Sequence, residues 1–184
     1  MQADQNDMIK DALASDAKYA AIADVSSIVF HESFRKACEQ NHCGKYNTNW
    51  MGPPAIGPIN ELIRKVRKYG KGLLFQTVYQ GSGSFDYKGM IEGMKFHEQV
   101  FRKLLERIKT NYHLKEILPL NAGCCGICKR CAYLDKEPCR YPDMAVSSLE
   151  AYGIDVTALE KACGIPYYNG KNTYSFVGLI LFNA

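Results

Sequence analysis

The stretch GLLFQTVYQ, residues 72–80, is a run of mainly apolar, aromatic and β-branched side chains. A run of this length, bounded by glycines, is typical of a strand that is buried in the middle of a sheet. Glycine stands at both ends of the run, at Gly70 and at Gly81. We therefore expect a buried central strand here, and the other elements are placed outward from it.

Helices are predicted on both sides of this strand. Residues 59–69 form an amphipathic helix that Gly70 closes, and residues 86–113 form the longest helix of the chain. The apolar stripe of the longer helix is made of Met90, Met94, Phe101, Leu104, Leu105 and Ile108. Further helices are expected at 5–16 and 31–41, and two short ones at 147–163.

Further strands are predicted from shorter apolar runs. The runs AAIA and SIVF lie within residues 18–31, and KEILPLNAG, 115–123, leads into a cysteine-rich loop. Residues 165–183 predict a hairpin across Asn169-Gly170 with a buried last strand. Helices that alternate with strands predict an α/β (α+β) fold, with a mixed sheet of four or five strands packed by helices. We expect residues 1–184 to form a single domain.

The composition limits the class of protein. A chain of 184 residues that is 47% hydrophobic can bury a large core and does not need disulfide bonds to fold. It contains no run of about 20 apolar residues, which a membrane-spanning helix requires. Its N-terminus lacks the basic start and apolar middle of a secretory signal. We therefore expect a cytoplasmic protein, in which clustered thiols hold metal or take part in redox chemistry.

The net charge of +4 is modest, and the basic residues gather in IRKVRKYGK, residues 63–71. Aromatic residues do not alternate with these charges as they do on base-stacking surfaces. We interpret the segment as the solvated face of the helix at 59–69 and expect no nucleic-acid partner.

Five of the eight cysteines lie in LNAGCCGICKRCAYLDKEPCRYPDMA, residues 120–145. Their spacing is Cys125-x2-Cys128-x2-Cys131-x7-Cys139, with Cys124 directly before it. Glycines let the three closely spaced thiols converge, and the fourth thiol arrives from further along the loop. This spacing resembles the cysteine run of bacterial ferredoxins, in which the fourth cysteine of the run serves the other cluster. A metal-binding loop is therefore predicted at 121–145.

The spacing favours one kind of metal centre over another. Structural zinc usually takes two C-x2-C pairs separated by a dozen or more residues, whereas three cysteines at intervals of three suit a [4Fe-4S] cluster. Lys129, Arg130 and Arg140 are expected to offset the charge of the thiolates. Zinc stays an alternative, as does a thiol set that senses peroxide or forms disulfides without a stable metal.

Two quoted segments resemble a family of uncharacterised prokaryotic proteins described as predicted metal-binding proteins. The first is SFRKACEQNHCGKYNTNWMGPP, where family members often read C-x4-C-G-x-Y-x2-N-x2-C-P-P. The second is GCCGICKRCAYLDKEPCRYPDMAVSSLEAYGIDVT, where members read roughly G-x-C-x2-C-x2-C and then P-C-R-x-P. The resemblance runs from about residue 28 to the C-terminus. It implies metal binding, with an iron–sulfur centre expected, and no particular reaction.

One position departs from that family pattern. Gly52 stands where the resemblance implies a cysteine, so that an N-terminal site built on Cys38 and Cys43 would lack a ligand. These two thiols either join a metal site or are ordinary buried cysteines. We expect the Cys/Pro loop at 38–58 to fold over residues 124–139, with Cys38 or Cys43 near the metal, Trp50 shielding it from water and a gap at Gly52.

Three further residues have a structural and a functional interpretation. His97 on the long helix either faces the metal as ligand or proton donor or, as we favour, is a hydrogen-bonded histidine at the edge of the core. Cys124 is interpreted as a bystander, the alternative being a spare thiol that exchanges with a ligand. Cys163 is interpreted as a packing residue at a helix end.

The sequence leaves three functions open. The first is a [4Fe-4S] protein that transfers electrons or acts as an accessory protein, because a cluster held by four thiolates has no free coordination site. The second is an iron–sulfur enzyme with an open iron site. The third is a structural zinc module for protein interaction. A redox partner or small molecule is expected for the first two, and the sequence defines neither it nor the oligomeric state.

Overall fold

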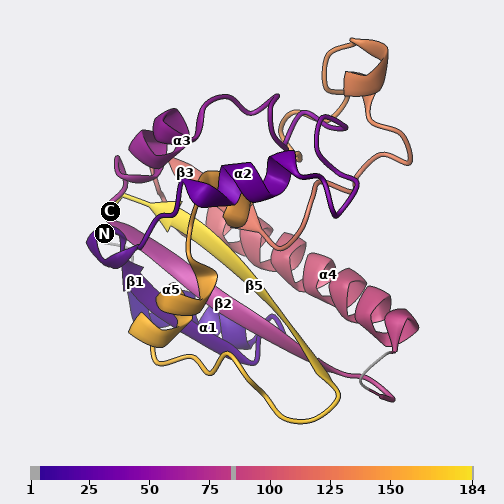
Figure 1. Ribbon diagram of the computed structural model, residues 1–184. Coiled ribbons are helices and arrows are strands. Elements are labelled where there is room, and N and C mark those ends of the chain that lie inside the picture. Colours follow the sequence, from indigo (N-terminus) through magenta and orange to yellow (C-terminus); the bar gives the residue numbers. More distant parts are fainter. Residues whose placement is uncertain (1–4, 84–85, 184) are drawn as a thin grey trace.

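The computed structural model describes residues 5–83 and 86–183 (Figure 1). Its centre is one open sheet with the strand order β1-β2-β5-β3-β4. The strands are β1 (Tyr19–Asp24), β2 (Lys71–Gln80), β3 (Ile117–Asn121), β4 (Ser147–Ser148) and β5 (Thr173–Phe182). Neighbouring strands are antiparallel except β3 and β4, which are parallel. The prediction of a mixed sheet of four or five strands in an α+β fold is confirmed.

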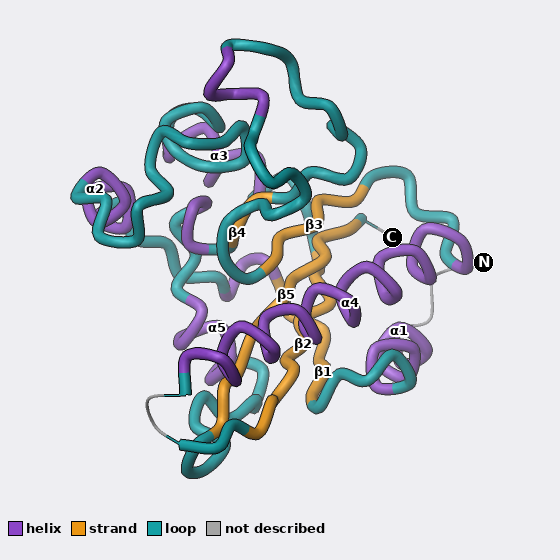
Figure 2. Tube along the Cα trace, turned by 90° about the vertical axis from the view of Figure 1, so that its right-hand side faces the viewer, coloured by secondary structure: helices purple, strands orange, loops and turns teal. Residues whose placement is uncertain are grey.

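Helices cover both faces of the sheet (Figure 2). They are α1 (Gln5–Leu13), α2 (Ser33–Glu39), α3 (Ile59–Val66), α4 (Tyr87–Asn111) and α5 (Val156–Ala162). Three short 3-10 helices are η1 (Val25–Ser27), η2 (Ala132–Asp135) and η3 (Glu150–Tyr152). The side chains of α1 and α4 pack on one face, and those of α3, α5 and η3 pack on the other. No helix within the described residues is long and apolar enough to cross a membrane.

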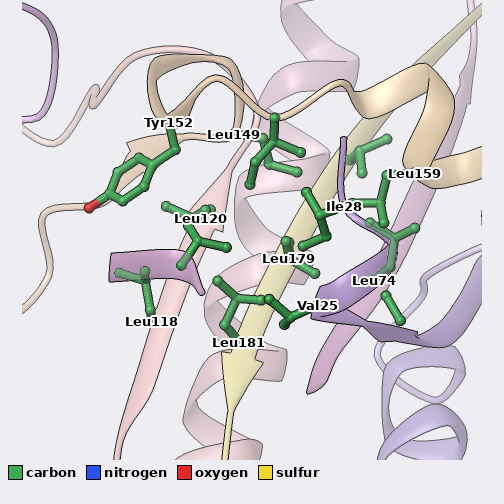
Figure 3. Packing of buried hydrophobic residues seen from close by; sticks show 14 of the residues in the cluster. Val25, Ile28, Leu74, Leu118, Leu120, Leu149, Tyr152, Leu159, Leu179 and Leu181 are labelled. Carbon is green, nitrogen blue, oxygen red and sulfur yellow. The ribbon is translucent and has the colours of Figure 1, made fainter. Parts of the chain in front are cut away.

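The alternation of side chains along β2 explains why consecutive residues at its centre are apolar. Leu73 and Phe75 point into the core beneath α1 and α4, whereas Leu74 points into the core on the opposite face (Figure 3). All three are fully buried. A strand that is covered on both faces buries successive side chains on alternating sides, which is the physical reason for the apolar run at its centre. Burial covers residues 72–77, whereas Val78 and Tyr79 are half-buried and Gln80 is exposed.

Three local predictions were wrong. The run SIVF begins within η1 instead of forming a strand, and only Phe30 makes a single bridge, to Ile154. The segment before Asn169 forms no hairpin, because β5 pairs with β2 and β3. Met94 is 42% exposed, whereas its neighbour Gly93 is buried against the sheet. A Cβ added at Gly93 would lie 2.9 Å from the Cβ of Tyr79, so the missing side chain lets the helix approach β2 closely.

His97 is a hydrogen-bonded histidine, as predicted, but it lies inside the core and not at its edge. It is 1% exposed, and its ring stacks on Phe75 with 5.5 Å between the ring centroids. Its Nδ1 lies 2.8 Å from the Thr77 hydroxyl and its Nε2 lies 2.8 Å from the Asn121 carbonyl oxygen Oδ1. The Asn121 amide nitrogen donates to Glu98, so Oδ1 accepts from Nε2 and the Thr77 hydroxyl donates to Nδ1. This network holds the end of β3, from which the cysteine loop departs.

The burial of His97 predicts a loss of stability in acid. Burial lowers the pKa of His97 to about 4, below its ordinary value of 6.5. The unfolded chain therefore binds a proton that the folded chain does not, and this stability is complete above pH 6.5 and lost as the pH falls toward 4. The shift corresponds to about 3 kcal/mol of unfolding free energy. Urea unfolding at several pH values between 7 and 4 measures how the unfolding free energy changes with pH. This pH dependence should be weaker in His97→Gln, and an equal pH dependence in both proteins would contradict the assignment.

Candidate metal centre

The cysteine loop is the connection between two parallel neighbouring strands. Residues 122–146 leave the sheet at the end of β3 and return at β4, where Leu120 and Asn121 pair with Ser147 and Ser148. The pairing brings both ends of the loop to the same edge of the sheet. Gly123 has a positive φ of 70°, which a glycine adopts without steric cost, and it turns the chain away from the sheet just before Cys124.

Four thiols of this loop line one small cavity. They are Cys125, Cys128, Cys131 and Cys139. The cavity has a volume of about 20 Å³, close to the space that one water molecule needs. Cys131 and Cys139 are near enough to Cys125 for their charges to raise its pKa. The loop thus brings together the four cysteines that the sequence singled out.

The Cys125 thiol is the best characterised of the four. Burial raises its pKa above the ordinary value of 9.0, while hydrogen bonds from the backbone N–H groups of Ile127 and Val146 lower it in part. Backbone N–H groups of this kind stabilise a metal-bound thiolate and hold its sulfur in position. The same arrangement leaves the thiol protonated at neutral pH, so metal binding at Cys125 would release a proton.

The basic residues of the loop serve its own structure. Arg130 forms an ion pair with Asp135 over 2.7 Å, and Arg140 Nη1 donates to the Arg130 carbonyl oxygen over 3.0 Å. Lys136 closes η2 in the left-handed region, at φ 59°. No cationic side chain of the described residues lines the thiol cavity. The expected offset of thiolate charge by Lys129, Arg130 and Arg140 therefore does not come from direct contact.

The N-terminal Cys/Pro loop folds over the cysteine loop, as predicted (Figure 1). Trp50 Nε1 donates to the Glu137 carbonyl oxygen over 2.9 Å, and its ring packs edge-on against Tyr133 at 4.9 Å between the ring centroids. The Tyr133 hydroxyl donates to Asn47. Asn49, Trp50 and Met51 also line the thiol cavity. Trp50 thus lies where it limits the access of water to the thiols.

The remaining cysteines lie outside this cavity. Cys38 and Cys43 are close enough to interact electrostatically, and burial raises the pKa of Cys38 while Arg35 opposes the rise. Neither of them lines the thiol cavity. The structure therefore does not bring Cys38 or Cys43 to the four loop thiols, contrary to the expectation. Cys124 is exposed and does not line it either. Cys163 packs against the core, which confirms its interpretation as a packing residue.

The expected gap at Gly52 is filled. Gly52 is buried, and a Cβ added there would lie 3.0 Å from Asn49 Nδ2 and 3.3 Å from its Oδ1. Asn49 is 5% exposed, and its Oδ1 accepts from the Met51 backbone N–H over 3.1 Å. Because Asn49 also lines the thiol cavity, its amide occupies the space next to the thiols that a side chain at position 52 would otherwise approach.

The donor set fits a thiolate-bound metal group. Four thiols, with no carboxylate or imidazole among the lining residues, are the ligand type that selects zinc, copper(I) or iron–sulfur clusters. Among residues 5–83 and 86–183, no three His, Cys, Asp or Glu side chains already form a group that could hold a metal ion. The cavity, at about 20 Å³, is also too small to hold a multi-iron cluster as it stands. A multi-iron cluster would require the loop at 124–131 to open outward, which the exposed Gly123 and Gly126 permit.

A larger cleft, which was not predicted from the sequence, adjoins the thiol cavity. Its volume is about 910 Å³, and Trp50, Met51 and Cys139 belong to both spaces. Arg64, Lys65 and Lys68 lie along its wall, on the segment that we interpreted only as a solvated helix face. The spacing of these three charges, close together at the end of one helix, was the available signal. The other lining residues, among them Trp50, Cys139 and Tyr152, come from distant parts of the chain, so the cleft itself could not be predicted from this segment.

Removing the Trp50 ring is expected to expose the thiols. In Trp50→Ala the loop loses one hydrogen bond and one aromatic contact, together worth about 2 kcal/mol, so alkylation of the four cysteines by iodoacetamide should accelerate about tenfold or more. Mass spectrometry of the labelled peptides, after chelator treatment and under anaerobic conditions, measures the rate. Trp50→Phe, which keeps an aromatic ring, is the matched control. Equal labelling in all three proteins would show that Trp50 does not cover the thiols.

Comparison with known proteins gives one match. No curated protein and no solved structure matches the chain significantly. A family model described as predicted metal-binding protein (DUF2284) matches residues 21–182. This range contains all eight cysteines and all five strands, apart from the first two residues of β1. This agrees with the resemblance found in the sequence and with the four thiols that share a cavity. The chain therefore belongs to the DUF2284 family of predicted metal-binding proteins.

Proposed function

We propose that this protein binds a [4Fe-4S] cluster through Cys125, Cys128, Cys131 and Cys139, and that it transfers electrons or serves as an accessory protein in a reducing cytoplasm. One observation carries the proposal. The four cysteines whose spacing resembles a ferredoxin run line a single cavity, although Cys139 is separated from Cys131 by seven residues. When bound, such a cluster supplies one-electron chemistry.

The side chains and backbone around the thiols support this role. The N–H groups of Ile127 and Val146 that point at Cys125 stabilise negative charge on its sulfur. Trp50, held by Glu137 and Tyr133, limits the access of water and oxygen. Both effects tune the potential of a thiolate-bound cluster and protect it from oxidation.

Metal analysis of the full chain, purified without oxygen, tests the proposal. We expect about four iron and four sulfide per chain for a cubane, together with visible absorption that bleaches on reduction by dithionite. Zinc at one equivalent with no sulfide would overturn the iron–sulfur assignment in favour of the structural zinc module. Protein without iron, sulfide or zinc after anaerobic purification would overturn the proposal of a metal-binding role at these thiols.

A second candidate, an iron–sulfur enzyme, is favoured by one specific observation. Cys139 lines both the thiol cavity and the large cleft beside it. A molecule bound in the cleft would therefore contact the wall of the proposed cluster site. Loss of the cluster signal on Cys139→Ser together with loss of turnover would support an enzyme. A cluster that persists unchanged in Cys139→Ser would remove Cys139 from the ligand set.

A further inference from the structure

We infer that the cleft between α3 and the cysteine loop binds a small organic anion with a flat, apolar body. This inference goes beyond the proposed metal centre, because it rests on the shape and charge of the cleft. The volume of about 910 Å³ lies in the range of small-molecule sites. The cleft is formed by residues distant in sequence, from α3, from the loop around Trp50, and from the segments around Cys139 and Tyr152.

The positive charge of the cleft comes from three exposed side chains, Arg64, Lys65 and Lys68, and its lining includes one carboxylate, Glu61. Arg64 lies 3.9 Å from that carboxylate, at the outer limit of an ion pair between two exposed groups. Within the described residues, Lys65 and Lys68 have no ion-pair partner. Two uncompensated ammonium groups on the wall of a concave site favour an anionic ligand group.

The body of the cleft is apolar. Its lining includes Trp50, Met51, Ile56, Leu62 and Pro138. A lining that combines an aromatic ring with aliphatic side chains suits a flat hydrophobic body, whereas a free inorganic anion would leave this surface unused. The ligand class that satisfies both the charge and the apolar walls is therefore an aromatic or similarly flat carboxylate or phosphate ester.

Tyr152 supplies a polar group to the lining of the cleft. The residue is 5% exposed, and its hydroxyl points away from Leu149 and Leu120, with which its ring packs (Figure 3). Across residues 5–83 and 86–183 this hydroxyl makes no hydrogen bond, although Tyr152 lines the cleft. Burial raises the pKa of Tyr152, so the hydroxyl keeps its proton. A hydroxyl on the lining of the cleft that solvent can reach, and that no protein group engages, is available to a ligand oxygen.

Isothermal titration calorimetry on the full chain, prepared anaerobically with its metal, tests the inference. The probes are naphthoate and naphthyl phosphate, which are flat anions, and naphthamide, which has the same ring system without charge. We expect at least one anion to bind about tenfold more tightly than naphthamide. The double variant Lys65→Gln/Lys68→Gln should remove this preference, and Tyr152→Phe should weaken binding of the anion about fivefold. Higher salt should also weaken it.

The matched control is Lys88→Gln/Lys95→Gln, which removes two exposed charges from α4, whose residues do not line the cleft. It should bind the anions as the parent does. Equal affinity for naphthoate, naphthyl phosphate and naphthamide, or an anion preference that survives Lys65→Gln/Lys68→Gln, would overturn the inference. Calorimetry reports binding whatever metal the protein holds, so failure here is distinct from failure of the iron–sulfur assignment.

Discussion

Replacing any one of Cys125, Cys128, Cys131 or Cys139 with serine is expected to remove most of the metal from the protein. The four thiols line one cavity, and each would supply one of four ligands. Loss of a hydrogen bond around a ligand already costs about 10- to 100-fold in metal affinity, so loss of the ligand itself should cost more. Iron, sulfide and zinc analysis of each variant, purified without oxygen beside the parent, measures the effect.

The chain offers two matched controls for this experiment. Cys124 is next to the first ligand in sequence but is exposed and outside the cavity, and Cys43 is exposed on the N-terminal loop. Cys124→Ser and Cys43→Ser should therefore retain the metal of the parent. Full retention in all four cavity variants would contradict the site. Loss of metal in Cys43→Ser would instead show that the N-terminal loop supplies a ligand after rearrangement.

The elements of the fold that could be predicted from sequence are those with an unambiguous burial pattern. Residues 73–75 are consecutive apolar residues because both faces of β2 are covered at its centre. The stripe of α4 was predicted in part, because hydropathy gives weight to Met94 and none to Gly93. The close approach of a helix to a strand is a property of the pair. The hydropathy pattern of one segment alone does not reveal such a close approach.

The hairpin across Asn169-Gly170 failed for a related reason. Asn-Gly is a strong local turn signal, yet β5 finds its partners in β2 and β3, whose apolar faces complete both cores. Asn169 instead donates to Gln76 and Ser175 through its side chain. Long-range burial outweighed a local preference, and such competition is decided only when the strands meet.

The candidate site divides in the same way. The close spacing of Cys125, Cys128 and Cys131 predicted that these three thiols lie together, and the spacing alone left open whether Cys139 joins them. The structure places all four on one cavity. The covering of that loop by Trp50 was also expected, from the length of the segment at 38–58. The separate position of Cys38 and Cys43 and the cleft beside Cys139 depend on how α3 and the loops pack. The residue pattern of one segment alone predicts neither the position of these two thiols nor the cleft.

Chelation of the metal is expected to loosen the cysteine loop while the core still unfolds cooperatively. The two hydrophobic cores lie on either face of β2 and β5, and none of the four cavity cysteines belongs to them. Hydrogen exchange followed by mass spectrometry should show faster exchange across residues 122–146 after chelation. Amides of β2 and β5 should stay protected until global unfolding, because their hydrogen bonds pair strand with strand.

The size of the two responses distinguishes a local site from a metal-dependent fold. A metal that binds only the folded chain raises the midpoint of urea unfolding by mass action, so chelation should lower the midpoint. The dependence of unfolding free energy on urea should change by no more than about a tenth, since it scales with the surface that unfolding exposes and the loop is largely exposed already. If chelation abolished the cooperative transition, as it does in zinc fingers, the cores would be too weak to fold without the centre. Leu73, Leu74 and Phe75 of β2 are fully buried, as are Leu179, Ile180 and Leu181 of β5. This burial indicates that the two cores are strong enough to fold without the metal centre.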